Sequence, residues 1–181
     1  MGKAKGPKQV KLIIGLLSKN KKLLGFIEEF FIKKFGGIDY RSHDLPFSFT
    51  EYYKKEMGHP LIRRFISFQK PISPEYIASA KTITNRIEKR FSVKKSGAIK
   101  RKVNIDPGYI SDSKLVLATT KDYYHRIYLR DGIYAEVTLA WQKGCFRPFE
   151  WTYPDYGTEA YLAILNSIRN SYMKERGQYA G

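Results

Sequence analysis

The sequence has little of what disulfide, metal and secretion-related structures require. It holds one cysteine, Cys145, among 181 residues, so no intramolecular disulfide can form. Its three histidines, His43, His59 and His125, stand singly without an HxH or HExxH spacing, and we expect no metal site. No apolar run is long enough for a signal peptide or a membrane helix. A lone thiol in such a chain is typical of a reducing compartment, so we expect a cytoplasmic protein without a membrane partner.

The common motifs of nucleotide and acyl-transfer enzymes are missing as well. There is no GxxxxGK[ST] loop and no GxGxxG turn, and TKDY at 120–123 has its aspartate one residue too early for a guanine-reading TKxD. No GxSxG elbow occurs, and no nucleophile signature surrounds Cys145. GTP hydrolysis by a P-loop mechanism is therefore disfavoured, and the sequence identifies no cofactor.

Acidic residues are few beside the basic ones. The chain has 33 Lys and Arg against 17 Asp and Glu, a formal net charge of +16. The basic residues concentrate in the N-terminal segment and in KKSGAIKRK at 94–102. Such runs attract polyanions, so RNA or DNA binding is one hypothesis, and a merely solvated basic surface is the alternative.

The pattern of the first two thirds of the chain predicts an α+β fold. A content of 43% hydrophobic residues is enough for the core of one domain. QVKLIIGLLS predicts a buried strand, Asn20 and Gly36-Gly37 bound a helix, segments 38–49 and 59–72 are extended, and Ser73-Pro74 opens a second helix. NIDPGYI predicts a strand that runs into a turn. The order βαββαβ indicates a ferredoxin-like core, an antiparallel sheet with both helices on one face.

The rest of the chain predicts an extension of that sheet. SKLVLATT and a β-hairpin follow, and a final helix is capped by Thr158 and stopped by Gly177. We therefore expect one domain over residues 1–181. Its parts are a flexible basic N-terminus (1–9), the ferredoxin-like core (10–112), and the hairpin extension with the C-terminal helix (113–181).

The hairpin HRIYLRDGIYAEVTLAW alternates on both sides of its turn. A three-residue RDG loop would place Leu129 opposite Ile133, pair Arg126 with Glu136, and turn His125 toward the apolar face. A cross-strand ion pair on a solvated sheet is the simpler interpretation of Arg126 and Glu136. The other interpretation is that these polar residues form a functional surface.

Polar and aromatic residues gather near the predicted strand ends and turns, where binding sites often lie. The candidate catalytic residues are Glu136, His125 and Asp106. The candidate ligand-binding residues are Lys121, Arg126, Asn104, Tyr109, Trp151 and Asp155. Each has a simpler explanation: His125 as a hydrogen-bonded core histidine, Asp106 as part of an Asp-Pro-Gly turn, and the WTYPDY aromatics as a cover for a sheet edge.

Four long segments carry a resemblance to a known family. FTEYYKKEMGHPLIRRFISF, NIDPGYISDSKLVLATTKDYYHRIYL, DGIYAEVTLAW and WTYPDY resemble small bacterial proteins known only as a domain of unknown function, some labelled GTP-binding protein. The resemblance covers nearly the whole chain and implies no established activity. It places the motif residues at Glu51, Tyr52, Tyr53, Asn85, Asn104, Asp106, Tyr109, Lys114, Lys121, His125, Arg126, Glu136, Trp151 and Asp155, whereas the basic runs lie outside the motifs.

Three functions remain open at this point. The favoured one is a site for an anionic small molecule or nucleotide, in which Lys121 and Arg126 hold the anionic group and Glu136 positions Arg126 or acts as a base. The second is an RNA-binding module that uses the basic runs and exposed aromatic residues. The third is a structural protein that forms oligomers such as a homodimer. The sequence does not predict a reaction.

Overall fold

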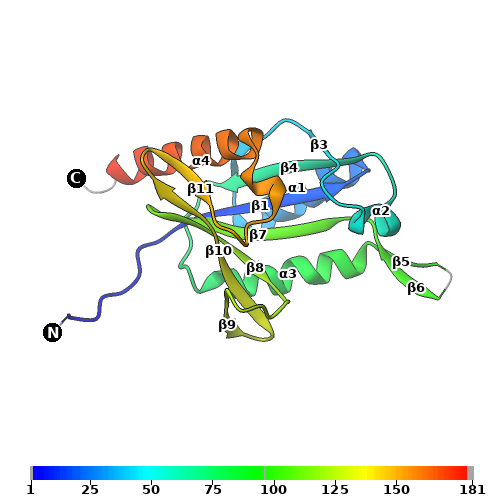
Figure 1. Ribbon diagram of the computed structural model, residues 1–181, viewed down its shortest axis with the longest axis horizontal. Coiled ribbons are helices and arrows are strands. Elements are labelled where there is room, and N and C mark those ends of the chain that lie inside the picture. Colours follow the sequence, from blue (N-terminus) through cyan, green and yellow to red (C-terminus); the bar gives the residue numbers. More distant parts are fainter. Residues whose placement is uncertain (1, 96, 179–181) are drawn as a thin grey trace.

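A large antiparallel sheet organises the protein, whose computed structural model describes residues 2–95 and 97–178 (Figure 1). Among these residues the sheet has nine strands in the order β11-β10-β8-β7-β1-β4-β2, with β3 paired to β4 and β9 to β10. The strands are β1 (Lys11–Ser18), β2 (Ile38–Arg41), β3 (Leu45–Phe47), β4 (Leu61–Phe68), β7 (Asn104–Ile110), β8 (Lys114–Thr119), β9 (Arg126–Arg130), β10 (Ile133–Gln142) and β11 (Cys145–Pro148). A separate hairpin joins β5 (Ser92–Lys95) to β6 (Ala98–Arg101).

Helices cover both faces of this sheet, so the fold is a mixed α/β fold in three layers (Figure 1). Side chains alternate along β1. Leu12, Ile14 and Leu16 face α1 (Lys21–Phe35) and α3 (Tyr76–Arg90). Ile13 faces the opposite core, which α4 (Glu159–Gln178) and the short 3-10 helix η1 (Pro154–Gly157) complete. The short helix α2 (Tyr52–Met57) lies beside β6.

The predicted helix boundaries are right at both ends of α1 and at the start of α4, where Thr158 Oγ1 accepts a hydrogen bond from the Tyr161 N–H at 3.4 Å; the others are shifted. The Asn20 side chain accepts a hydrogen bond from the Leu23 N–H, and Gly36 ends α1 with a φ of 99°. The second long helix begins at Tyr76, because 73–75 form a turn first. The last helix continues past Gly177 to 178. These differences leave the order of the elements unchanged.

The turn predicted at Asp106-Pro107-Gly108 is wrong, because these residues continue β7. Pro107 pairs in register with Ile14 of β1. On its other edge β7 pairs with β8 only from Gly108 to Ile110. A Cβ at Gly108 would lie 2.6 Å from the Val116 carbonyl oxygen, so only glycine permits this close approach. Proline has no N–H to donate to a neighbouring strand. Strands β7 and β8 therefore pair from Gly108 onward and diverge in the residues before it.

The hairpin between β9 and β10 has a shorter turn than the three-residue loop predicted from the sequence. Asp131 and Gly132 have φ values of 54° and 70°, as a two-residue type I′ turn requires. Ile133 therefore pairs with Arg130 and not with Leu129. An irregularity after Ile133 leaves Leu129 out of the register and restores the predicted pairing of Glu136 with Arg126.

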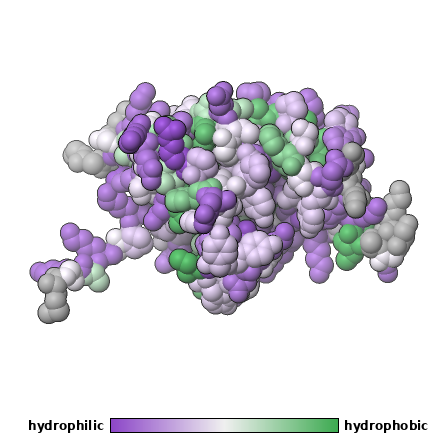
Figure 2. All heavy atoms as spheres, in the orientation of Figure 1, coloured by the Kyte–Doolittle hydropathy of each residue, from purple (hydrophilic) through white to green (hydrophobic). Residues whose placement is uncertain are grey.

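The exposed surface is mostly hydrophilic on the face drawn in Figure 2, with apolar side chains scattered over it. Residues 2–9 are exposed and have no regular secondary structure. Within the described part of the chain, no helix combines the length and the apolar character needed to span a bilayer.

Candidate functional site

A cavity of about 990 Å³ opens where β7 and β8 diverge. Its wall combines side chains from strands of both sheets, from the loops beside them, and from α2, α3 and η1. The basic side chains that line it are Arg63, Lys81, Lys100, Arg101, Lys121 and Arg126, and the acidic ones are Glu56, Glu88, Asp106, Glu136 and Asp155. Aromatic side chains of Phe47, Phe49, Tyr52, Tyr53, Tyr153 and Tyr156 complete it.

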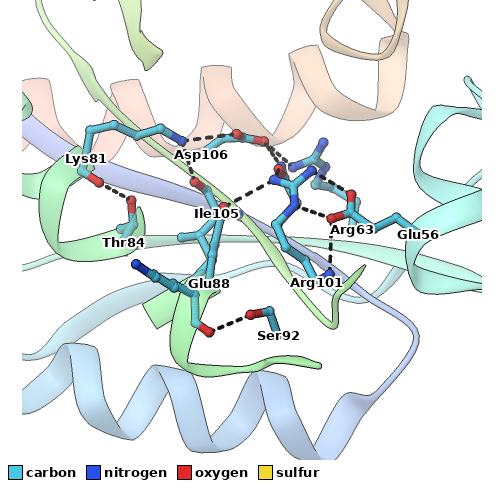
Figure 3. Close-up of polar contacts among 11 residues, drawn as sticks. Glu56, Arg63, Lys81, Thr84, Glu88, Ser92, Arg101, Ile105 and Asp106 are labelled. Atoms are coloured by element: carbon cyan, nitrogen blue, oxygen red, sulfur yellow. Dashed lines mark hydrogen bonds and ion pairs between the residues drawn. The ribbon is translucent and has the colours of Figure 1, made fainter. Parts of the chain in front are cut away.

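Two side chains of α3 take the place of β8 along the open edge of β7. The Ile105 N–H donates to a carboxylate oxygen of Glu88, and the Ile105 carbonyl accepts from Lys81 Nζ at 2.9 Å (Figure 3). Both backbone groups would otherwise be unpaired, and a buried unpaired group is costly. Glu88 and Lys81 therefore satisfy the backbone of β7 where β8 is not paired with it.

The floor of the cavity is a buried charged cluster around Arg63 of β4. Arg63 donates from Nη1 to Asp106 Oδ2 at 3.0 Å and from Nη2 to Asp155 Oδ2 at 3.4 Å. Asn104 Nδ2 donates to the same Asp106 oxygen at 2.7 Å. Lys81 Nζ lies 3.8 Å from Asp106 Oδ1 (Figure 3). Two cations and two carboxylates therefore meet here and balance each other.

Gly15 of β1 makes room for this cluster. A Cβ at this position would lie 3.2 Å from both Arg63 Nη1 and the Tyr156 hydroxyl oxygen. That hydroxyl is buried, and it has no hydrogen-bond partner among the described residues. The guanidinium and the phenol thus lie directly over the backbone of the central strand.

On the β10 side of the cavity, Glu136 gathers three partners. Arg126 Nε and Nη2 both lie 2.8 Å from Glu136 Oε2, and both side chains are only 3% exposed. His125 Nε2 lies 3.1 Å from the same oxygen, and Thr138 Oγ1 lies 3.2 Å from Oε1. The solvated interpretation of this pair is therefore wrong, because the pair is buried. The register predicted for His125 is also wrong, since His125 turns toward Glu136.

The mouth of the cavity is taken as its exposed wall residues, among them Tyr52 of α2, Ile99 of β6 and Lys121 after β8. Arg101 of β6 makes a two-pronged contact with Glu56 of α2, with Nε to Oε1 and Nη2 to Oε2 both at 2.8 Å. Lys121 is exposed, and its ammonium group lies 5.3 Å from the centre of the Tyr52 ring. Lys121 Nζ has no ion pair or hydrogen bond with a described residue.

Burial and ion pairing act on the carboxyl groups in opposite directions. Burial raises the pKa of Asp155 and of Glu88, and the nearby cations Arg63 and Lys81 oppose the rise. Hydrogen bonds from Arg101 lower the pKa of Glu56. The floor thus contains carboxyl groups that hold a proton more readily than usual, and the mouth contains one that releases it more readily.

The structure brings six of the nine candidate residues to one cavity. Asn104, Asp106, Lys121, Arg126, Glu136 and Asp155 all line it. His125 and Trp151 are not among the wall residues. Their rings stack with centres 5.4 Å apart, and Trp151 Nε1 donates to the Val137 carbonyl. Tyr109 does not belong to the group, because it packs with α3 residues on the other face of the sheet.

Sequence reasoning missed Arg63, Lys81, Glu88, Arg101 and Tyr156, which all line the cavity. Two signals pointed to them. Arg63 and its neighbour Arg64 are the two charged residues of a mostly apolar strand, LIRRFISF. Lys81 and Glu88 are seven residues apart and therefore share a helix face, which here is buried. Tyr156 lies in the WTYPDY segment, but nothing in the sequence placed it beside Gly15, which is far away along the chain.

Within residues 2–95 and 97–178, no three His, Cys, Asp or Glu side chains are grouped so that they could hold a metal ion. The polar groups of the cavity are cationic, carboxylate, amide and hydroxyl groups. They can bind an anion, exchange hydrogen bonds with a ligand and move a proton.

Comparison with known protein families gives a match over most of the chain. A family model described as Domain of unknown function (DUF4416) matches residues 8–172, a span that contains every residue of the cavity wall. No curated protein and no solved structure matches the chain significantly. The match covers more than half of the chain, and the chain therefore belongs to the family Domain of unknown function (DUF4416).

Proposed function

We propose that the cavity binds a small anionic molecule, with Lys121 as the residue that holds the anionic group. One observation carries this proposal. Lys121 is a cation at the mouth of a large cavity, and its ammonium group has no carboxylate partner among the described residues. The other cations of the wall that contact carboxylates have their charge balanced there. A phosphate or carboxylate of a ligand would supply the missing partner.

The size of the cavity supports a ligand larger than a simple ion. Ligand pockets in proteins range from about 300 to 1,000 Å³ and combine apolar walls with a few placed polar groups. This cavity, at about 990 Å³, has that composition. The net charge of +16 would also attract an anion from a distance.

Of the candidate catalytic residues, Asp106 is the one that a ligand in the cavity would touch, because its side chain is 24% exposed there. Glu136 is a positioning residue, since its carboxylate fixes the Arg126 guanidinium. His125 contacts Glu136 from behind. These roles are part of the proposal, and they assign no reaction.

We also propose that the centre of the sheet is a ferredoxin-like core. In chain order its elements are β1, α1, β2, β4, α3 and β7. Their arrangement β7-β1-β4-β2, antiparallel throughout, with α1 and α3 on one face, supports this proposal. The strands from β8 onward extend the sheet. The free thiol of Cys145 supports a reducing, cytoplasmic location.

A thermal-shift screen tests the proposed function. The compounds are inorganic phosphate, sugar phosphates, nucleotides and small dicarboxylates, each added to the wild type, to Lys121→Ala and to Lys22→Ala. Lys22→Ala is the control: it removes the same charge as Lys121→Ala, but Lys22 is an exposed lysine of α1 that does not line the cavity. A ligand at about 100 times its Kd stabilises a protein by about 2.7 kcal/mol.

We expect at least one anion to raise the melting temperature of the wild type and of Lys22→Ala, and to have little effect on Lys121→Ala. Equal shifts in all three proteins would show that the anion binds elsewhere. If no compound acts, while RNA binds with an affinity that falls steeply with salt and depends on residues 94–102, the RNA-binding alternative would replace this proposal.

A further inference from the structure

The hydrogen-bonding groups of the cavity that lack a partner indicate what a ligand must supply. Most polar side chains of the wall bond to each other, as Arg63 does with Asp106 and Arg101 with Glu56. Among the described residues, the Asn85 side chain makes no hydrogen bond. Among the described residues, the second oxygen of Asp106, Oδ1, accepts none either, and the Lys81 ammonium lies 3.8 Å from it.

Asn85 and Asp106 Oδ1 belong to the same part of the cavity. Asn85 lies on α3 between Lys81 and Glu88, four residues after one and three before the other, so the three side chains share one helix face. All three line the cavity. Because Lys81 Nζ lies near Asp106 Oδ1, the α3 face with Asn85 and the edge of β7 with Asp106 enclose one space.

The free groups match an uncharged partner better than a charged one. The charges of Arg63, Lys81, Asp106 and Asp155 already balance, so a second anionic group has no cation to meet at the floor. An asparagine amide offers one donor and one acceptor side by side, and it pairs with any planar group that presents the converse. Asp106 Oδ1 adds an acceptor for one more N–H.

Aromatic rings stand beside these groups. Phe47 and Tyr53 line the cavity, with their ring centres 5.9 Å apart. Tyr53 and Asp106 both line the cavity, and burial raises the pKa of Tyr53, with the charge of Asp106 as a further cause. A flat ring entering this space would therefore have aromatic surface to pack against.

We infer that the ligand is a bipartite molecule, whose anionic group binds Lys121 and whose head is a nitrogen heterocycle with an amide-type edge that Asn85 and Asp106 recognise. A nucleobase is the commonest group of this chemistry, so a nucleotide is the expected class. This inference rests on the proposed function, because it places the anionic group of the same ligand at Lys121. It adds Asn85 and Asp106 as the residues that recognise the heterocyclic head of that ligand.

The test separates the two parts of the ligand. Isothermal titration calorimetry compares the four common ribonucleoside 5′-monophosphates, their nucleosides and ribose 5-phosphate. The proteins are the wild type, Asn85→Leu, Asn170→Leu and Lys121→Ala. Among the described residues the Asn85 side chain makes no hydrogen bond, so Leu, which is of similar size, removes only its amide. Asn170 is the control, an exposed asparagine of α4 outside the cavity wall.

We expect one monophosphate to bind the wild type at least about tenfold more tightly than ribose 5-phosphate, as one well-paired edge provides. Asn85→Leu should abolish that advantage and leave the affinity for ribose 5-phosphate unchanged, and Asn170→Leu should change neither. Lys121→Ala should weaken the binding of every phosphorylated compound and leave that of the nucleoside unchanged.

Four other outcomes would overturn one or both proposals. If ribose 5-phosphate binds as tightly as every monophosphate, the inference about the head fails while the proposed function stands. If a monophosphate keeps its advantage in Asn85→Leu, the inference fails in the same way. If none of these compounds binds, but another anion does so through Lys121, again only the inference fails; if no anion binds, both fail.

Discussion

Arg126 and Glu136 face each other across β9 and β10 and form an ion pair that is almost completely buried, with Nη2 and Oε2 2.8 Å apart. Arg126 also donates from Nη1 to the Lys121 carbonyl at 3.1 Å. The pair therefore ties the hairpin to the backbone of the residue that we propose as the anion ligand. The sequence pattern favours a solvent-exposed ion pair, but in the structure both residues are buried and line the cavity.

Breaking this pair should be costly. Glu136→Ala leaves the Arg126 charge buried without a carboxylate, and the loss of one partner of a buried pair typically costs about 3–5 kcal/mol. We expect a loss of that size in the free energy of urea unfolding. The double variant Arg126→Met with Glu136→Met should recover most of it, because no uncompensated charge remains. A loss below about 1 kcal/mol in Glu136→Ala would mean that water reaches the pair.

Gly108 should be required for the junction of β7 and β8. In Gly108→Ala the new Cβ would meet the Val116 carbonyl oxygen at 2.6 Å, and overpacking of this kind costs about 1–3 kcal/mol. Gly25→Ala is the matched control, because no atom lies within 4 Å of its Cβ position in α1. That variant should gain about 0.5–1 kcal/mol from helix propensity. Equal chemical denaturation curves for the two variants would contradict this account of the junction.

Removing the Tyr156 hydroxyl, which has no hydrogen-bond partner among the described residues, should not destabilise the protein. A buried polar group without a hydrogen bond costs about 1–3 kcal/mol, and phenylalanine has the same shape without that group. Tyr156→Phe should therefore leave the free energy of unfolding unchanged or raise it. Tyr172→Phe is the contrasting variant, because its hydroxyl donates to the Gln9 carbonyl at 2.6 Å, and it should lose about 1 kcal/mol. Destabilisation of Tyr156→Phe by as much as Tyr172→Phe would show that the Tyr156 hydroxyl has a bound partner.

Acid should weaken the contact between α2 and β6. Hydrogen bonds from Arg101 lower the pKa of Glu56 below its ordinary value of 4.5. A lowered folded-state pKa contributes stability above the unfolded-state value and loses it as the pH falls through the folded-state value. The contribution, up to about 1 kcal/mol for this partly exposed pair, should therefore disappear below pH 4.5.

The comparison of wild type with Glu56→Gln isolates this effect. The difference in their unfolding free energy should be largest near neutral pH and should shrink as the pH falls below 4.5. Glu29→Gln, at an exposed position of α1, should show no comparable change. A constant difference between wild type and Glu56→Gln across this range would exclude the ion pair as its source. Asp155, whose pKa is raised by burial, acts in the opposite sense in both proteins and cancels in the comparison.

The sequence predicts the order of the elements well because local signals determine it. Asn20 and Gly36 bound α1 by capping chemistry that involves only neighbouring residues, and the pairing of Arg126 with Glu136 follows from alternation around a turn. The exact turn was missed, since the Asp131-Gly132 pair fits both a two-residue and a three-residue loop.

The cavity could not be predicted in the same way. It exists because β7 and β8 separate before Gly108, which depends on contacts between distant segments. Asp-Pro-Gly is typical of a turn, but Pro107 here lies in a strand whose outer edge is satisfied by α3. The six candidate residues that do line the cavity come from segments near that separation. Arg63 and Tyr156 meet only in the folded chain, over Gly15.

The central claim is that Lys121 holds the anionic group of a small molecule in this cavity. The most direct test is a calorimetric titration of the best-binding anion into the wild type, Lys121→Ala and Lys22→Ala at one salt concentration. A charged hydrogen bond contributes about 1.5–3 kcal/mol, so we predict a loss of affinity of about 10-fold to 100-fold in Lys121→Ala and none in Lys22→Ala. The same affinity in all three proteins would contradict the account.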